Sequence, residues 1–367
     1  MKSFSSPGRI ELGGNHTDHQ NGRVLAAAVD RGTTATARMR DDNIIKVVSK
    51  GYGETVVDVN DLEPERAGKV SDIIKGMVAG FKDAGGACGG FEAHVTSNIP
   101  AGAGLSSSAS FEILIGKILN DLYNDNKFDA VAIAKMGQRA EMEFYGKPCG
   151  LMDQLACAWG GIIHVDFENP DMPLVSPVDF DFEKHGYEIC ITNTGGSHED
   201  MTEDYAAVPR EMTQVAEYFG KNVLRQVDKG ALLKEAPRIR EALGDRPFLR
   251  AMHFMNENER VGLEREALEA GDISEFLRLM RESGNSSFKY LQNVCRYVGG
   301  AGVEQQLSVA LAVSEDFLGS AGASRVHGGG FAGTIIAIVK KESAPDYIRL
   351  MNQLFGADSC QTYKIKR

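Results

Sequence analysis

Two patterns of hydrophobic and polar positions divide the chain into segments that predict helices and segments that predict strands. Apolar residues that recur at spacings of three and four indicate a helix with one buried face. Short apolar or alternating runs that end at Gly, Asp, Asn or Pro indicate strands. The clearest helical run has apolar positions at Phe111, Leu114, Ile115, Ile118, Leu119 and Leu122.

These patterns predict strands early in the chain, helices in its second half and a mixed end. Strands are predicted over residues 24–29, 33–36, 44–48, 56–59, 91–95, 160–167, 187–192, 334–339 and 362–365. Helices are predicted over residues 71–82, 111–122, 129–141, 223–243, 256–270, 273–283, 303–317 and 344–355. Because strands and helices are partly segregated, we expect an α+β fold in two halves, with a boundary or surface excursion at the Pro- and Asp-rich residues 169–177.

Composition limits the possible partners and the compartment. The chain has 367 residues, 43% of them hydrophobic, which is long enough for two domains. Its formal charge is −11, from 40 Lys and Arg against 51 Asp and Glu, so we expect no nucleic-acid or anionic-membrane partner. Six widely spread cysteines without a C-x-x-C pair predict neither a disulfide framework nor a zinc ribbon. No segment has the apolar length of a signal peptide or membrane span, so we expect a cytoplasmic protein.

A glycine- and serine-rich loop directly before the clearest helical run predicts an anion-binding site. Residues 100–110 read P-A-G-A-G-L-S-S-S-A-S. The glycines permit turns that are closed to residues with a Cβ atom, and the serines bring hydroxyls to the start of the helix. The free N–H groups and positive dipole end of such a helix bind an anion such as a polyphosphate. The alternative that the serines only cap the helix stays open, and the chain has no Walker A sequence.

Short polar side chains among glycines near the N-terminus predict a sugar-binding turn. Residues 6–19 read S-P-G-R-I-E-L-G-G-N-H-T-D-H. Neighbouring sugar hydroxyls both donate and accept, so Asp18 can accept from two of them while His16 or Asn15 completes the set. A solvated loop is one alternative. Metal binding by His16, Asp18 and His19 is another, although no further ligands at a telling spacing support it.

Two carboxylates flank a turn that contains glycine and proline. Glu141 lies near the end of a predicted helix, and Asp153 follows the turn at residues 146–150. Phosphoryl transfer needs a magnesium ligand and a group that positions or deprotonates the attacking hydroxyl, and Glu141 and Asp153 can fill these roles respectively. A nearby cation such as Arg9 would hold Asp153 ionised. Taken singly, each acid is more typical of a surface or capping residue than of a catalytic one.

A third cluster, R-V-H-G-G-G-F-A-G at residues 325–333, formally contains G-x-G-x-x-G. A dinucleotide-binding fingerprint leaves a strand and enters a helix, whereas these glycines lead into the strand predicted at residues 334–339. Close approach of the backbone to a ligand or to another loop is the better interpretation.

In this order and spacing, the clusters resemble those of the GHMP small-molecule kinases, and within them the galactokinase branch. Residues 100–110 are similar to the family phosphate loop P-x-x-x-G-L-S-S-S-A-[AS], and residues 325–333 resemble the third glycine motif. Pro7-Gly8-Arg9 with Gly14-x-His16-Thr17-Asp18 resembles the galactokinase signature. Residues 149–154 resemble the segment that carries the catalytic aspartate.

The resemblance implies a fold and an activity. The fold is the two-domain GHMP kinase fold, an α+β fold with mixed sheets flanked by helices. Residues 1–180 would form the first domain and residues 181–367 the second, with the active site in the cleft between them. The activity is ATP-dependent phosphorylation of the anomeric C1 hydroxyl of galactose or a closely related hexose. ATP and Mg²⁺ are the implied cofactors, the sugar and ATP are the only implied partners, and the oligomeric state, monomer or dimer, stays open.

The resemblance also implies roles for individual residues. It implies Asp153 and Arg9 as catalytic residues, and Ser108 and Glu141 as the protein ligands of Mg²⁺. The implied sugar-binding residues are Asn15, His16, Asp18, His19, Gly150 and Tyr205. The implied ATP-binding residues are Gly102, Gly104, Leu105, Ser106, Ser107, Ser108 and Ala109.

Two positions depart from the galactokinase pattern Gly-Glu-His-Thr-Asp-Tyr: Asn15 replaces the glutamate and His19 the tyrosine. In the family that glutamate faces the C6 end of the sugar, where it would repel a C6 carboxylate, whereas Asn15 can donate a hydrogen bond. Residues 18–22 also resemble the equivalent stretch of plant galacturonokinases, so galacturonate is the alternative substrate. A non-catalytic sensor of sugar and nucleotide is the alternative from another class, and the intact phosphate loop with Asp153 and Arg9 favours the kinase.

Overall fold

The computed structural model describes residues 1–100, 102–195, 202–298 and 302–366, so Ala101 of the phosphate loop lies outside the described residues. A first sheet occupies the beginning of the chain. Its strands are β1 (Lys2–Gly13), β2 (Arg23–Met39), β3 (Ile44–Ser49), β4 (Gly53–Asp58), β5 (Phe91–Ser97), β6 (Ile162–Asp166) and β7 (Leu174–Val178). The strand order is β4-β3-β5-β2-β6-β7, with β1 paired to β2. β2 is the central strand because it pairs antiparallel with β1, β5 and β6.

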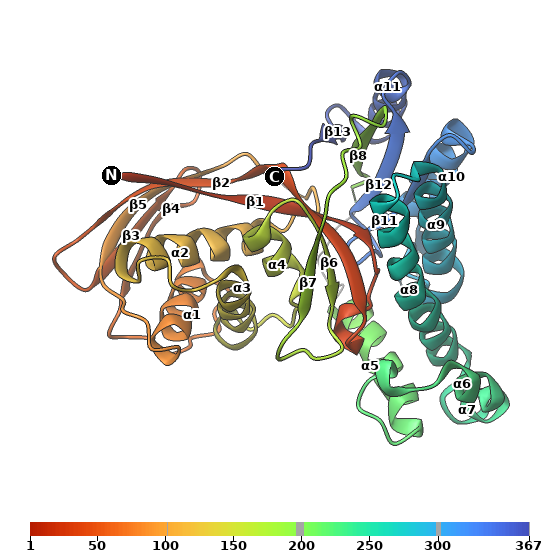
Figure 1. Ribbon diagram of the computed structural model, residues 1–367, viewed down its shortest axis with the longest axis horizontal. Helices are drawn as coiled ribbons and strands as arrows, with labels where there is room; N and C mark the ends of the chain where they lie inside the picture. The colour runs from red at the N-terminus through yellow and green to blue at the C-terminus, as the bar shows by residue number, and fades with distance from the viewer. Residues whose placement is uncertain (101, 196–201, 299–301, 367) are drawn as a thin grey trace.

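Helices cover one face of the first sheet (Figure 1). They are α1 (Val70–Asp83), α2 (Ser107–Tyr123), α3 (Ala130–Arg139), the π-helical turn η2 (Ala140–Tyr145) and α4 (Met152–Trp159). Their apolar faces pack on β2 and β5 in one buried cluster. The cluster includes Val24, Val47, Ile74, Phe81, Phe91, Ile113, Leu114, Ile118 and Leu155.

A second sheet and most of the remaining helices form the other half. The sheet has the antiparallel order β11-β12-β8-β13. Its strands are β8 (Tyr187–Asn193), β11 (Ala323–His327), β12 (Thr334–Lys340) and β13 (Cys360–Tyr363), and β9 (Arg296–Val298) pairs separately with β10 (Gly302–Glu304). The helices are α5 (Thr202–Tyr218), η3 (Leu224–Gln226), α6 (Lys229–Lys234), α7 (Ala236–Leu243), α8 (Asp245–Glu269), α9 (Ile273–Ser286), η4 (Ser287–Leu291), α10 (Gln306–Leu318) and α11 (Ala344–Phe355).

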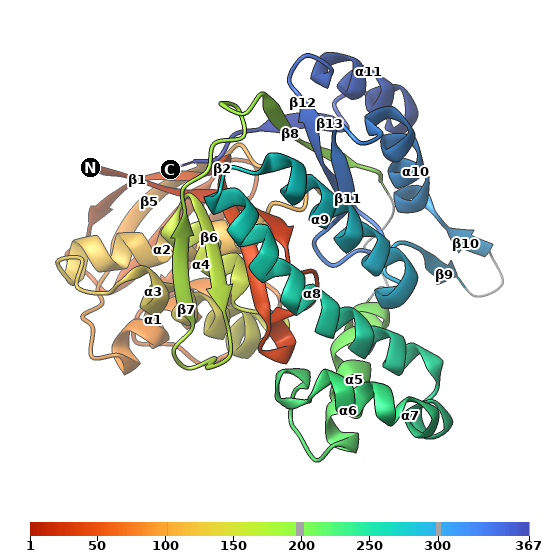
Figure 2. The same ribbon diagram turned by 45° about the vertical axis from the view of Figure 1, so that its right-hand side comes forward.

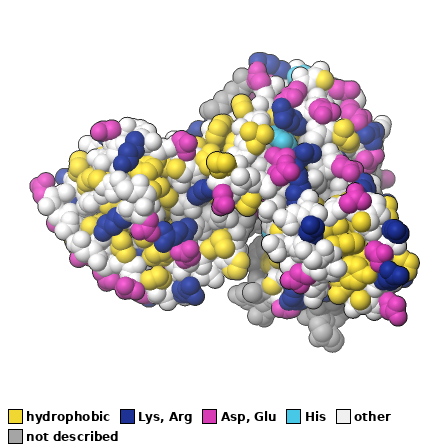
Figure 3. Space-filling view, turned by 60° about the horizontal axis from the view of Figure 1, so that its bottom comes forward, with side chains coloured by type: hydrophobic (Ala, Val, Ile, Leu, Met, Phe, Trp, Pro, Cys, Tyr) yellow, Lys and Arg dark blue, Asp and Glu magenta, His cyan; other side chains and the backbone are white. Residues whose placement is uncertain are grey.

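The two halves meet through the second face of β1 and β2. α8 and α9 lie between the two sheets in the turned view (Figure 2), and their apolar side chains pack on both. This shared cluster includes Ile10, Leu12, Leu25, Ala27, Val261, Leu268, Phe276, Leu279, Ile336 and Ile338. Full burial of each such side chain stabilises the fold by about 1.5–3 kcal/mol. The surface is indented between the two halves (Figure 3).

The predicted α+β fold with helix-flanked sheets is confirmed. Three local predictions differ from the structure. β1 shows no alternation because residues 6–13 are buried on both faces. β7 crosses the predicted surface excursion, and the single helix predicted at residues 223–243 is divided into η3, α6 and α7, with Pro237 in the first turn of α7. The boundary between residues 180 and 181 stays a prediction. No described helix is both long and apolar enough to cross a membrane.

Candidate active site

The phosphate loop presses against the second half of the chain. Gly102 and Gly104 have φ values of 69° and 67°, in the left-handed region that favours glycine. A Cβ atom on Gly104 would lie 2.6 Å from Thr334 Oγ1, and one on Gly102 would lie 2.9 Å from Asn193 Nδ2. Glycine therefore permits a contact between the loop and the second sheet that a larger residue would prevent.

α2 begins without a side-chain cap. Ser106 is its N-cap residue, but the Ser106 hydroxyl makes no bond to the helix and donates instead to Asp153 Oδ2. Ser108 Oγ donates to Glu141 Oε1 at 3.3 Å, and Ser107 is exposed. The alternative in which all three serines only cap the helix is therefore wrong for Ser106 and Ser108. The first N–H groups of α2 can bind an anion.

Arg9 on β1 and Asp153 in the first turn of α4 form a bidentate ion pair. Arg9 Nε donates to Asp153 Oδ1 at 2.6 Å, and Nη2 donates to Oδ2 at 2.8 Å. Arg9 Nη1 donates to the Gly104 carbonyl at 2.5 Å. One guanidinium group therefore joins β1, α4 and the phosphate loop, and its planar fork fixes the orientation of the carboxylate.

The ion pair keeps Asp153 ionised. Burial acts to raise the pKa of Asp153, but the charge and hydrogen bonds of Arg9 and the hydrogen bond from Ser106 bring that pKa below its ordinary value. A carboxylate with a lowered pKa can orient a hydroxyl group but is a weak proton acceptor.

Glu141 lies in η2 and faces the start of α2. Its side chain is buried, and Oε1 accepts hydrogen bonds from Ser108 Oγ and, at 3.0 Å, from Lys147 Nζ. A carboxylate oxygen and a hydroxyl oxygen side by side suit a hard divalent cation that takes its other ligands from phosphate and water. Within the described parts of the chain, no group of three or more His, Cys, Asp or Glu side chains could hold a metal ion.

A second buried carboxyl group, Glu112, lies behind Glu141 and is missed by motif analysis. Gln154 Nε2 donates to Oε2 of both Glu112 and Glu141, each at 3.0 Å. Burial and then the Glu141 charge raise the pKa of Glu112 well above its ordinary value. Glu112 therefore binds a proton more readily than an ordinary carboxyl group does, and the Gln154 amide bonds both acids. Its signal in the sequence is an acid inside the apolar run at residues 111–122.

Asn15 belongs to the predicted sugar-binding turn at residues 6–19, which we call the sugar loop, and its side chain is fully buried. Its Nδ2 donates to Glu11 Oε1 at 3.0 Å and to the Gly328 carbonyl at 2.7 Å. Its Oδ1 accepts from Asn293 Nδ2 at 2.9 Å and from Ser287 Oγ at 3.4 Å. Both amide hydrogens are thus occupied within the protein. The sugar contact predicted for Asn15 would have to replace one of these bonds.

The two predicted histidines of the loop are neutral and close together, with ring centroids 5.6 Å apart. Burial lowers the pKa of His16 to about 4, and its Nε2 donates to the Gly329 carbonyl at 2.9 Å. Burial, and then the neighbouring His16, lower the pKa of His19 to about 3. Both ring nitrogens of His19 are buried and have no hydrogen-bond partner in the described structure. A neutral imidazole of this kind can bond a sugar hydroxyl.

Asp18 lies against the turn that precedes α4. A Cβ atom on Gly150 would lie 1.6 Å from Asp18 Oδ2, so glycine is required for the carboxylate to occupy this position. Asp18 Oδ1 accepts the His19 N–H at 2.9 Å. Burial and then the charge of Asp153 raise the pKa of Asp18 to about 6.

The third glycine cluster contacts the sugar loop and Tyr205. The Tyr205 hydroxyl donates to the Gly330 carbonyl at 3.0 Å, and a Cβ atom on Gly329 would lie 2.4 Å from Tyr205 Cε1. The carbonyls of Gly328 and Gly329 hold the side chains of the sugar loop. The predicted close approach to another loop is confirmed, and so is the strand that follows, β12.

α8 fixes the backbone of the sugar loop through residues that no motif indicates. Glu257 Oε1 accepts the N–H groups of Gly14 at 3.2 Å and Asn15 at 3.4 Å. His253 Nε2 donates to the Asn15 carbonyl at 2.8 Å, since its Nδ1 is bonded to Ser286 Oγ. A helix that begins 230 residues further along the chain (245 against 15) supports the loop, so sequence proximity gives no signal of it.

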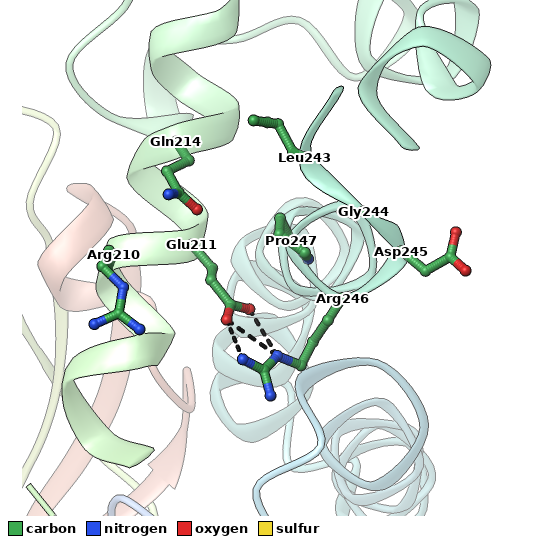
Figure 4. Close-up of a pocket in the computed structure, with 8 residues that line it drawn as sticks. All are labelled: Arg210, Glu211, Gln214, Leu243, Gly244, Asp245, Arg246 and Pro247. Atoms are coloured by element: carbon green, nitrogen blue, oxygen red, sulfur yellow. Dashed lines mark hydrogen bonds and ion pairs between the residues drawn. The ribbon is translucent and has the colours of Figure 1, made fainter. Parts of the chain in front are cut away.

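A surface pocket of about 410 Å³ lies away from this site, between α5 and the start of α8 (Figure 4). Its walls include the Glu211 carboxylate, which Arg246 and Arg250 bind. None of the predicted site residues lines it.

Known proteins similar to this chain agree with the geometry. The profile for "GHMP kinases N terminal domain" matches residues 72–161, and the profile for "Galactokinase galactose-binding signature" matches residues 2–39. The galactokinase of Clostridium tetani (strain Massachusetts / E88) is 33% identical over 346 residues, which cover 93% of this chain and 84% of the relative. That of Glaesserella parasuis serovar 5 (strain SH0165) is 31% identical over 350 residues, which cover 93% and 86%.

Solved structures share the fold. The crystal structure of Lactococcus lactis galactokinase complexed with galactose matches 100% of this chain and 93% of its own, with a TM-score of 0.84 and 27% identity. Methanococcus jannaschii mevalonate kinase matches with a TM-score of 0.68 at 17% identity, which supports the fold alone. Fold and site together define a GHMP small-molecule kinase. Within that class the chain belongs to the galactokinase family and is an ATP-dependent sugar kinase, as predicted.

Asn15→Glu is expected to destabilise the protein, because it buries a second carboxylate within hydrogen-bond distance of Glu11. Glu11→Gln removes one of these charges, so the double variant should be more stable than the sum of the single effects by about 1–3 kcal/mol. The measurement is the free energy of unfolding in urea. Asp346→Asn, at an exposed carboxylate on α11, is the control and should change little. Strict additivity of the two site substitutions would contradict the coupling.

Proposed function

We propose that this protein transfers the γ-phosphoryl group of ATP to the C1 hydroxyl of galactose. The observation that carries the proposal is the position of the Arg9–Asp153 pair. Asp153 accepts a hydrogen bond from Ser106 of the phosphate loop, and its charge reaches Asp18 of the sugar loop. A group at this junction can touch both the donor and the acceptor of a phosphoryl group, and galactokinases are the relatives that match nearly the whole chain.

The nucleotide phosphates would bind at the start of α2. Backbone N–H groups and the serine hydroxyls supply donors there, and the dipole of α2 favours negative charge. Leu105 and Ala109 are buried on either side of the serines, which holds the loop in place. The proposed ATP-binding residues are Gly102, Gly104, Leu105, Ser106, Ser107, Ser108 and Ala109.

Mg²⁺ would bind to Ser108 Oγ and Glu141 Oε1, with phosphate and water oxygens as its other ligands. The buried Glu141 carboxylate beside the Ser108 hydroxyl supports this assignment. When bound there, a magnesium ion neutralises charge on the phosphate oxygens.

Asp153 would orient the C1 hydroxyl, and Arg9 would stabilise charge on the transferred group. Because the pKa of Asp153 is lowered, early removal of the hydroxyl proton is disfavoured. A loose phosphoryl-transfer transition state needs little such removal, so positioning and charge account for most of the catalysis.

The sugar would lie between Asp18, His19 and Tyr205. The Asp18 carboxylate can accept from two hydroxyls, and the unpartnered ring nitrogens of His19 can serve a third. His16 and Gly150 would act by holding this arrangement, since His16 bonds the third glycine cluster and Gly150 leaves room for Asp18. Galacturonate is less well supported than galactose, because both Asn15 amide hydrogens are already bonded within the protein.

A panel of hexoses with measured kcat/KM tests the substrate. Galactose should exceed galacturonate by at least about 100-fold, because both Asn15 amide hydrogens are already bonded within the protein and cannot receive a C6 carboxylate. If kcat/KM for galacturonate equals or exceeds that for galactose, galacturonate is the substrate and the proposal for galactose is wrong. Binding of both ATP and galactose without turnover of any hexose would support the sensor instead.

Asp153→Asn should lower kcat by about 100- to 10,000-fold, because the amide keeps the size of the side chain and loses its charge. The dissociation constant for galactose, measured by calorimetry, should change little. Asp346→Asn again serves as the control, with unchanged kcat. If the Asp153→Asn variant folds and keeps most of its kcat, Asp153 has no catalytic role.

A further inference from the structure

Lys147 is an active-site cation that none of the sequence motifs indicates. It lies in the turn between η2 and α4, directly after Gly146. Its Nζ donates to Glu141 Oε1 at 3.0 Å, the same oxygen atom that accepts from Ser108 Oγ. The Lys147 side chain is 61% exposed, whereas that of Glu141 is 4% exposed. A largely exposed side chain therefore places its charge beside a buried carboxylate.

The surroundings of Glu141 explain why a cation is held there. Its other oxygen, Oε2, accepts a hydrogen bond from Gln154 Nε2, which also donates to Glu112. Among the described residues, Lys147 is the one Lys or Arg that forms an ion pair with Glu141. A buried carboxylate without a cation is costly, and the Lys147 ammonium offsets part of that cost.

The ammonium group is bonded to one of the two oxygen atoms that would hold a divalent cation. Ser108 Oγ and Glu141 Oε1 are the two oxygen atoms proposed to bind Mg²⁺, and Lys147 already uses the second. Two positive charges cannot share one carboxylate oxygen at hydrogen-bond distance without strong repulsion. Metal and ammonium therefore exclude one another at Oε1.

We propose that Lys147 is the resident cation of the metal site: it holds Glu141 Oε1 in the nucleotide-free enzyme and leaves it when the metal binds. The inference rests on the proposed magnesium site. Free metal must compete with Lys147, and binds weakly for that reason. Metal delivered on a nucleotide brings negative phosphate groups with which the released ammonium can pair, so the nucleotide and the metal assist each other.

The Lys147 charge also acts on two other residues of the site, Tyr205 and Asp153. Burial raises the pKa of Tyr205, and the Lys147 charge counteracts part of that rise. Burial raises the pKa of Asp153, and Arg9 and Ser106 lower it. The Lys147 charge adds a smaller lowering effect. The ammonium therefore lies within electrostatic reach of both Tyr205 and Asp153.

The test is the affinity of the full-length protein for Mn²⁺ without nucleotide, measured by electron paramagnetic resonance. Lys147→Met removes the competing charge and should bind Mn²⁺ about two- to fivefold more tightly than the unsubstituted protein. Lys147→Arg keeps a cation and should bind Mn²⁺ as the unsubstituted protein does. Lys184→Met, at an exposed lysine 75% open to solvent, is the control and should change nothing.

With the non-hydrolysable analogue of magnesium ATP, Lys147→Met should bind more weakly than the unsubstituted protein, the opposite direction from its effect on free metal. A merely structural role for Lys147 would weaken both affinities or neither. The inference is overturned if Lys147→Met binds free Mn²⁺ no more tightly than the unsubstituted protein. It is also overturned if the double variant Lys147→Met/Glu141→Gln binds Mn²⁺ as tightly as Lys147→Met does. Lys147→Gln repeats the test should the methionine variant fold poorly. Absent hexose turnover in the unsubstituted protein would contradict the proposed function and leave the metal competition measurable.

Discussion

Arg9 and Asp153 hold one another in a bidentate ion pair that joins β1, α4 and the phosphate loop. Burial of either charge alone would cost about 3–5 kcal/mol, so each needs the other in place. The same contact lowers the pKa of Asp153 and turns its carboxylate toward the start of α2. Stability of the fold and geometry of the reacting centre therefore depend on one interaction.

Around this pair, each ligand site is built where distant segments meet. The phosphate loop touches the second sheet through Gly104. Glu257 of α8 binds the backbone of the sugar loop, and the carbonyls of Gly328 and Gly329 bind its side chains. These contacts close the site only when both halves of the chain are folded. Asn15 takes part in these contacts through its hydrogen bond to Glu11. The residue at position 15 must therefore fit beside Glu11 as well as suit the sugar.

Sequence patterns predict the elements whose environment is uniform along their length. α2 and β12 are examples, since each is buried along most of its length. β1 escapes prediction because residues 6–13 are buried on both faces and are interrupted by polar side chains. In the site, Arg9 lies in a short motif and is predictable, and its contact with Asp153 agrees with that motif. Lys147 and Glu257 act through partners that only the fold brings near them.

The position of the transferred phosphate is the most direct test of this account. Proton and phosphorus NMR of the product formed from galactose and magnesium ATP identifies the phosphorylated carbon. The arrangement of Asp153 between the phosphate loop and the sugar loop predicts a phosphate on C1, with coupling between phosphorus and the anomeric proton. A phosphate on C6, or no phosphorylated product although ATP and galactose both bind, would contradict it.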